Sequence, residues 1–193
     1  MARILYIKVS DSAKRVKLGV EDGAETVSLV LSDVAYSDFG FPEREDEIDE
    51  YTLSEMKAED EKYRALRKAM GYLALSDRSR LALIMRLKQS GFSSHAAEYA
   101  TDECIRLGYL DEDRQLSRLV ETEANYRLRG RYYIKRKLAA KGYSVSHIDR
   151  ALALLVERGD IDFDSNFERL AEKRGALSDD DREALKYRFG YKI

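Results

Sequence analysis

The stretch RLRGRYYIKRKLAAKGYSVSHIDRALALL, from Arg127 to Leu155, decides the fold because an earlier part of the chain repeats its pattern. Shifting the chain by 51 residues places Leu87 on Leu138 and Gly91 on Gly142, and the match continues over about 35 positions. Further aligned pairs are Phe92 with Tyr143, Ser93 with Ser144, Ala100 with Ala151, Gly108 with Gly159, Leu110 with Ile161, Asp111 with Asp162, Asp113 with Asp164, Leu116 with Phe167 and Leu119 with Leu170. A shared period of this length predicts a tandem repeat.

Glycines and capping residues divide each copy into three predicted helices. If Gly142 adopts a left-handed conformation, Leu138 and Tyr143 make the apolar contact that accompanies a Schellman helix ending. Ser144 can then cap the next helix, because its hydroxyl accepts a first-turn N–H group. The same reasoning applies to Leu87, Gly91, Phe92 and Ser93, to the helix ends at Gly108 and Gly159, and to the caps Asp111 and Asp162.

A third copy begins near the end of the chain but is short. It opens with Ser178, continues through Leu185 and Phe189, and stops soon after Gly190. We therefore expect two complete three-helix repeats and a truncated third one.

The N-terminal part of the chain has a different pattern. The β-branched runs Arg3–Val9, Arg15–Val20 and Thr26–Val30 predict a small antiparallel β-meander. Residues 31–39 fit a short helix. The acidic run Glu43–Glu50 fits a linker, either simply solvated or shielding a basic surface elsewhere.

A long helix should connect this module to the repeats. Thr52 and Glu55 form a capping box, and Tyr51 and Met56 a hydrophobic staple, so the helix should start near residue 51. The sequence thus predicts a mainly α protein with a small N-terminal antiparallel β-meander. Its predicted parts are residues 1–50 (meander and acidic linker), 51–76 (connecting helix), 77–126 and 127–177 (complete repeats) and 178–193 (truncated repeat).

Composition fits a helical protein with a real core. Of 193 residues, 44% are hydrophobic and 36% are charged, and one proline is present. No apolar run approaches the length of a membrane span and no signal peptide opens the chain, so we expect a cytoplasmic protein without membrane association. One cysteine and two histidines exclude an internal disulfide framework and a dense zinc-ligand cluster.

Charge is distributed unevenly although the net charge is only −2. Residues 1–60 carry 7 basic and 15 acidic residues, a balance of −8, while residues 61–193 carry 27 and 21, a balance of +6. The most basic stretch contains seven basic residues without an acid before Asp149, and two tyrosines among them. These candidates for binding a partner or DNA are Arg127, Arg129, Arg131, Lys135, Arg136, Lys137 and Lys141, with Tyr132 and Tyr133 as candidates for base stacking.

Each candidate also has a plainer interpretation. The basic residues could form a solvated helix face, and the tyrosines could be half-buried packing residues. Comparison of the copies favours binding, because Lys135 and Arg136 replace Ile84 and Met85 of the first copy. We expect the apolar face of the first copy to be covered by the N-terminal module or the long helix, and the basic face of the second to meet an anionic partner.

These motifs also carry a resemblance to a known family. The segments LALSDRSRLALIMRLKQSGFS, IRLGYLDEDRQLSRL and RYYIKRKLAAKGYSVSHIDRAL, in this order, resemble the RecX family of RecA-modulating proteins. The resemblance implies a tandem three-helix-repeat regulator that binds the RecA filament on single-stranded DNA. It further implies inhibition of recombination, of ATP hydrolysis and of the co-protease function in the SOS response. The chain departs from the family in its short third repeat and in Lys137, where family members tend to carry glutamate.

No pattern of catalytic residues competes with this interpretation. The sequence contains no P-loop, dinucleotide fingerprint or nucleophile elbow. Cys104 aligns with the core position Leu155, which predicts a buried thiol, and helix capping explains the acids Asp111, Glu112 and Asp113. We expect no enzyme, no cofactor and a monomer. The alternative to a RecA regulator is a stand-alone helical-repeat protein that binds nucleic acid without sequence specificity.

Overall fold

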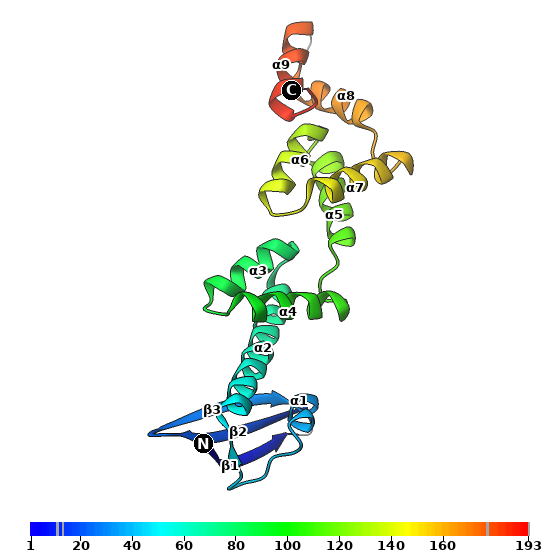
Figure 1. Cartoon of the computed structure of the whole chain (residues 1–193). Coiled ribbons are helices and arrows are strands. Elements are labelled where there is room, and N and C mark those ends of the chain that lie inside the picture. The colour runs from blue at the N-terminus through cyan, green and yellow to red at the C-terminus, as the bar shows by residue number, and fades with distance from the viewer. Residues whose placement is uncertain (11, 13, 177, 193) are drawn as a thin grey trace. The chain divides into compact units, whose positions relative to one another are not determined.

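The computed structural model describes residues 1–192 except 11, 13 and 177. Its elements, labelled in Figure 1 where space allows, are β1 (Ala2–Ser10), β2 (Arg15–Asp22), β3 (Glu25–Ser32), α1 (Asp33–Asp38), β4 (Glu47–Ile48), α2 (Glu50–Leu75), α3 (Arg80–Gln89), α4 (Ser94–Arg106), α5 (Glu112–Glu121), the π-helix η2 (Thr122–Tyr126), α6 (Arg131–Ala140), α7 (Val145–Glu157), α8 (Phe163–Arg174) and α9 (Asp179–Phe189). The predicted class, mainly helical with a small N-terminal antiparallel sheet, is confirmed.

The described residues form two compact units that do not follow the sequence period. Met1–Ser76 and Leu83–Tyr109 make up the first, while Asp77–Ala82 and the chain from Leu110 onward make up the second. Helix α5, which the repeat places with α3 and α4, therefore packs in the same unit as α6 and α7.

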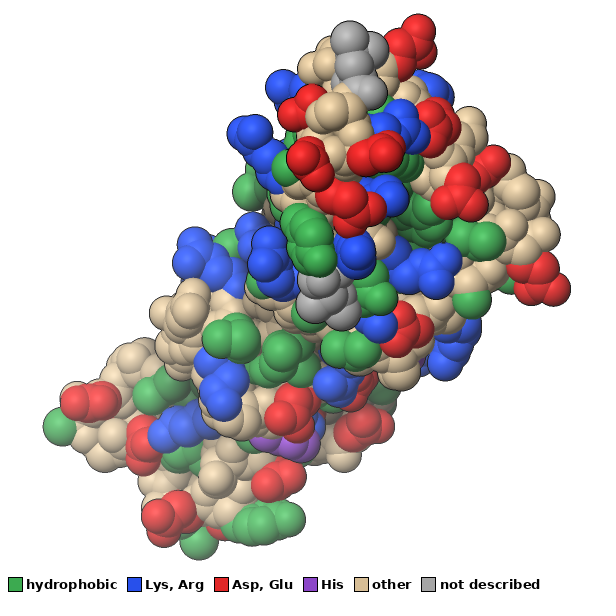
Figure 2. All heavy atoms as spheres, turned by 90° about the horizontal axis from the view of Figure 1, so that it is seen from above, with side chains coloured by type: hydrophobic (Ala, Val, Ile, Leu, Met, Phe, Trp, Pro, Cys, Tyr) green, Lys and Arg blue, Asp and Glu red, His purple; other side chains and the backbone are tan. Residues whose placement is uncertain are grey.

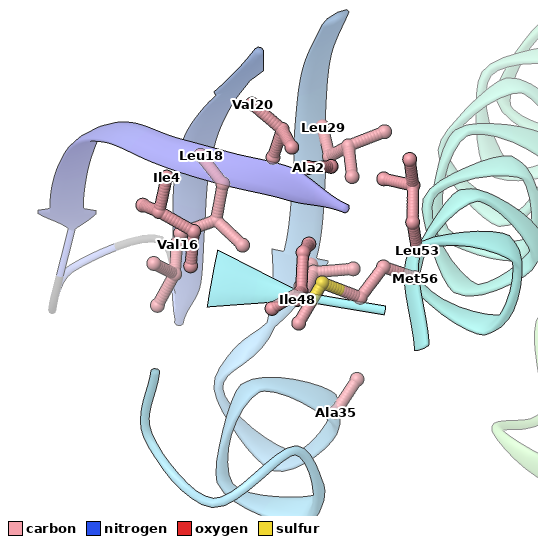
Figure 3. Packing of buried hydrophobic residues seen from close by; sticks show 11 residues of the cluster. Ala2, Ile4, Val16, Leu18, Val20, Leu29, Ala35, Ile48, Leu53 and Met56 are labelled. Atoms are coloured by element: carbon pink, nitrogen blue, oxygen red, sulfur yellow. The ribbon is translucent and has the colours of Figure 1, made fainter. Parts of the chain in front are cut away.

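The first unit contains the β-module. Its sheet has the order β3-β2-β1-β4 with antiparallel neighbours. Figure 3 shows apolar side chains of the strands meeting Leu53 and Met56 of α2, all of them buried. A small sheet becomes stable when its apolar face packs against another element, and this helix supplies that second layer of the core.

The acidic run predicted as a linker is partly a strand. Glu47 and Ile48 form β4 and pair with Arg3 and Ala2 at the outer edge of β1. Ile48 is buried, so its apolar side chain anchors the run to the sheet. The linker prediction is wrong for these two residues because a single apolar residue among acids gives too weak a pattern to indicate a strand.

Helix α2 begins at Glu50, close to the predicted residue 51, but its capping residue differs from the prediction. Asp49, not Thr52, is the N-cap, and its carboxylate accepts a hydrogen bond from the Thr52 N–H at 2.7 Å. This hydrogen bond from the Thr52 backbone holds the pKa of Asp49 below its usual value. The N-cap therefore lies about one turn before Thr52, while the helix itself begins where expected.

The predicted helix ends are confirmed. Gly91 and Gly142 have positive φ, and the N–H groups of Phe92 and Tyr143 donate to the carbonyls of Leu87 and Leu138, the Schellman pattern. The predicted caps also accept first-turn N–H groups; they are Ser93, Asp111, Ser144 and Asp162. Cys104 is buried as expected, and burial raises the pKa of its thiol to about 11.

The apolar face of the first copy is buried only in part. Ile84 is buried, but Met85 is 52% exposed. Neighbouring positions on one helix point in different directions, so covering one of them does not cover the other.

Strand β3 has an exposed edge that α2 closes at one point. Asp60 is 2% exposed, and its carboxylate accepts the Val30 N–H at 2.8 Å and pairs with Arg64 at 2.6 Å. An edge N–H that would otherwise lack a strand partner is thereby satisfied.

Replacing Asp60 should therefore loosen the contact between sheet and helix. We expect Asp60→Ala to lower the free energy of unfolding by about 1–3 kcal/mol, because it leaves the Val30 N–H without its acceptor. Asp60→Asn, which keeps an acceptor oxygen, should lose less, and the exposed Glu55→Ala on the same helix should be nearly neutral. Denaturant unfolding of the three variants measures this, and equal stability of Asp60→Ala and wild type would contradict it.

Candidate nucleic-acid and partner interface

Helix α6 carries most of the basic residues that the sequence singles out. Its C-terminal end is fixed by the Schellman turn at Gly142, while its N-cap Gly130 has no side chain with which to cap the helix. The backbone of the C-terminal segment takes this role. The N–H of Gly130 donates to the Phe189 carbonyl at 2.8 Å, and the N–H of Tyr132 donates to the Gly190 carbonyl at 2.9 Å.

These two hydrogen bonds need glycine on both sides. A Cβ on Gly130 would overlap the backbone of Gly190 and Tyr191, and one on Gly190 would overlap Tyr133. Gly190 also has φ +79°, which favours glycine. The end of α9 is thus held directly against the start of α6.

Two of the seven predicted basic residues form ion pairs with a buried carboxylate. Glu123, in the π-helix η2, is 4% exposed and pairs with Lys137 at 2.8 Å and Arg127 at 3.1 Å. Because a buried charge needs a partner, these two cations help to stabilise the fold. Lys137, a departure from the family pattern, therefore has an internal ionic partner in this chain.

Other predicted basic residues are held by aromatic rings or by an acid. The Arg129 guanidinium lies 4.4 Å from the ring centroid of Tyr133 and 4.5 Å from that of Phe189, which joins α6 to α9. Arg131 lies 5.4 Å from the Phe163 ring centroid. Lys135 pairs with Asp149 at 2.7 Å.

Two predicted cations have side chains directed to solvent. Arg136 and Lys141 are exposed, and within the described part of the chain neither side chain has an ionic partner. Tyr132 is 44% exposed, whereas Tyr133 is half-buried and contacts Arg129. The candidate residues therefore differ in how accessible their side chains are to a ligand.

The structure adds residues that the sequence patterns did not indicate. Tyr187, Arg188 and Lys192, from the end of α9 and the segment after it, line a hollow together with Tyr132 and Arg136. The alternation of basic and aromatic residues in KYRFGYK, Lys186–Lys192, is a signal that could have pointed to them. In Figure 2, which looks onto the C-terminal helices, basic, acidic and hydrophobic side chains lie intermixed.

The same region contains a buried tyrosine with an unusual environment. Tyr191 packs against the rings of Phe163 and Phe167, and burial raises the pKa of its hydroxyl to about 12. It is therefore neutral at physiological pH. Across the residues that the structure describes, no group of three or more His, Cys, Asp or Glu residues could hold a metal ion.

Comparison with known proteins supports the fold. No protein-family model and no curated protein sequence matches the chain. A crystal structure of regulatory protein RecX matches with a TM-score of 0.70 at 19% identity, over 95% of this chain and 89% of that one. This chain has the RecX fold. The structure of RecX from Lactobacillus salivarius matches with a TM-score of 0.55 at 20% identity, over 67% of this chain and 86% of that one.

The RecX fold accounts for the helical architecture behind the candidate interface. The two matches agree with the resemblance carried by the repeat motifs. In the described residues no helix is both long enough and apolar enough to cross a membrane.

The docking of α9 on α6 can be tested by adding one methyl group. We expect Gly130→Ala to lower the free energy of unfolding by about 1–3 kcal/mol, because the new Cβ overpacks the backbone contact. Amide exchange at Tyr132 should speed up, since its acceptor at Gly190 moves away.

Gly71→Ala is the matched control, because nothing lies within 4 Å of a Cβ at this position in α2. It should be neutral or slightly stabilising, as alanine is the better helix former. Unchanged exchange at Tyr132 in Gly130→Ala would mean that the contact is not tight in solution.

Proposed function

We propose that this protein is a RecX-like regulator that binds the RecA filament on single-stranded DNA and inhibits RecA. The observation that carries the proposal is the RecX fold over 95% of the chain, since one of the matching structures is a regulatory protein. The repeat motifs, which resemble the RecX family in three successive segments, give independent support.

The inhibited activities would be recombination, ATP hydrolysis and co-protease function in the SOS response. The protein would act as a monomer in the cytoplasm, by binding and without catalysis of its own. The basic residues of the second repeat would make the contacts, either with acidic groups of RecA or with DNA phosphates.

The basic residues can be ranked by how accessible their side chains are and by whether they already have an ionic partner. Arg136 and Lys141 are exposed without an ionic partner among the described residues, and Arg131 is exposed beside Phe163. Arg127, Lys135 and Lys137 already pair with acids of the same unit. The unpaired cations would therefore contribute most to binding, because they need not break an existing ion pair.

RecA-catalysed ATP hydrolysis on single-stranded DNA tests the proposal. Added below RecA stoichiometry, the protein should inhibit hydrolysis, and the inhibition should survive excess single-stranded DNA. An action on the filament would have this property, because free strands would not remove the regulator. Absence of inhibition would contradict the proposal.

A second candidate is a stand-alone nucleic-acid-binding protein. The exposed tyrosine and unpaired arginine of α6 favour it, since such side chains bind strands without RecA. Inhibition abolished by excess DNA would indicate this function. Tight binding of bare strands at low salt, lost steeply as salt rises, would have the same meaning.

Charge reversal tests the proposed contact face. Lys135→Glu combined with Arg136→Glu should weaken filament binding several-fold, because it replaces attraction to an anionic partner with repulsion. Arg150→Glu in α7 combined with Arg158→Glu at its C-cap makes the same charge change on exposed positions and should have a smaller effect. Equal binding of wild type and the α6 double variant, measured by fluorescence anisotropy, would remove this face from the interface.

A further inference from the structure

Two neighbouring hollows lie where α6, α8 and the end of the chain meet. The first has a volume of about 360 Å³ and is lined by residues of α6 and of the segment from Tyr187 to Lys192. The second, of about 390 Å³, also includes Phe163 and Phe167 of α8. Tyr132 and Lys192 line both, so the hollows adjoin at these two side chains. Volumes of this size fit a small-molecule unit.

The first hollow combines aromatic rings with uncompensated positive charge. Tyr132 and Tyr187 are 44% and 54% exposed, so part of each ring is accessible to a ligand. Arg136 and Arg188 have no ionic partner within the described part of the chain, and no described acid lines this hollow. Guanidinium groups bind phosphate oxygens in a bidentate manner, and exposed tyrosine rings stack on bases.

Lys192 adds a cation that already has an acidic partner. Its ammonium lies 5.5 Å from the Tyr187 ring centroid and 3.1 Å from Glu183. Hydrogen bonds from Lys186 and, to a smaller extent, Lys192 hold the pKa of Glu183 below its usual value. The cation stands at the boundary between the two hollows.

The second hollow differs in chemistry. Its lining includes the partly exposed ring of Phe163 and the more buried rings of Phe167 and Tyr191, with Arg131 and Lys186 at its wall and Asp164 as the only acid among its described lining residues. The carboxylate of Asp164 disfavours a phosphate close to it, but it can accept a hydrogen bond from an N–H group on a base edge. Aromatic walls with one acceptor suit a base better than a phosphate.

Other ligand classes fit this pair of hollows less well. An acidic peptide would use the cations but not the exposed rings, and an apolar peptide would bury Arg136 and Arg188 without partners, which is costly. A strand of nucleic acid uses both features, because its phosphates are anionic and every base has a stacking face.

We infer that the two hollows bind consecutive nucleotides of a single strand, with Tyr132 stacked between them. A phosphate meets Arg136 and Arg188, and the following base enters the hollow beside Phe163. This inference deepens the proposed function, because it names a direct DNA contact, and it rests on that function for the strand being one within a RecA filament.

Strand binding without RecA tests the inference with full-length protein. The probe is a fluorescein-labelled oligothymidylate measured by anisotropy, beside an abasic strand of equal length that keeps the phosphates and lacks the bases. Tyr132→Ala and Tyr187→Ala should each weaken thymidylate binding on the order of 10-fold, as the loss of one stacked base predicts. Binding of the abasic strand should be weaker in wild type and insensitive to these variants.

Conservative and distant substitutions control for folding and for general loss of aromatic surface. Tyr132→Phe keeps the ring and should bind like wild type, and so should Tyr109→Ala, which removes a tyrosine that is 53% exposed in the other unit. Photocrosslinking of wild type to a 5-bromouracil-substituted strand should label the peptides that contain Tyr132 or Tyr187.

Several results would overturn the inference. They are wild-type affinity in both alanine variants, equal affinity for thymidylate and abasic strands, or crosslinks confined to other helices. Displacement of the strand by equimolar free nucleoside triphosphate would assign the hollows to an isolated nucleotide instead. If the alanine variants bind strands normally while wild type inhibits RecA ATP hydrolysis, the nucleotide site fails and the proposed function stands.

Discussion

The ends of α3 and α6 depend on glycines that can adopt the left-handed conformation. Gly142 lets the Tyr143 N–H turn back to the Leu138 carbonyl, and Gly91 does the same for Phe92 and Leu87. A side chain at either position would strain the turn. Because each turn brings an apolar residue back onto the helix that it has just left, it fixes the direction of the next helix and lets the apolar stripe of α7 be buried.

The same kind of glycine has a second use at the end of the chain. Gly190 ends α9, and its carbonyl accepts the Tyr132 N–H at the start of α6. Helix N-termini leave several N–H groups without partners, and here backbone carbonyls take the place of a capping side chain. The contact brings Tyr187 and Lys192 beside Tyr132, so a constraint of helix geometry assembles the candidate binding surface.

Some basic residues of the second repeat stabilise the fold, and others remain available to a ligand. Glu123 holds Arg127 and Lys137, and the aromatic rings of Tyr133 and Phe189 hold Arg129. A count of basic residues along the sequence treats all of them alike. Burial separates them, because a charge that compensates a buried carboxylate is not free for a ligand, whereas Arg136 is exposed.

The sequence by itself determined the class of fold, the helix ends at Gly91 and Gly142, the caps at Ser93 and Ser144, and the buried position of Cys104. These are local or periodic properties, since a cap depends on neighbours within one turn and a buried face on a helical spacing. The sequence also contained the basic and aromatic residues of α6, but it could not rank them.

Tertiary structure decided the features that join distant parts of the chain. It paired β4 with β1, placed Asp60 of α2 on the edge of β3, put α5 in the unit of α6 and α7, and brought Tyr187 to Tyr132. Such contacts depend on how whole elements pack, and local propensity and spacing carry no information about that. For this reason the period of the sequence predicted the helices, while only their packing defined the candidate site.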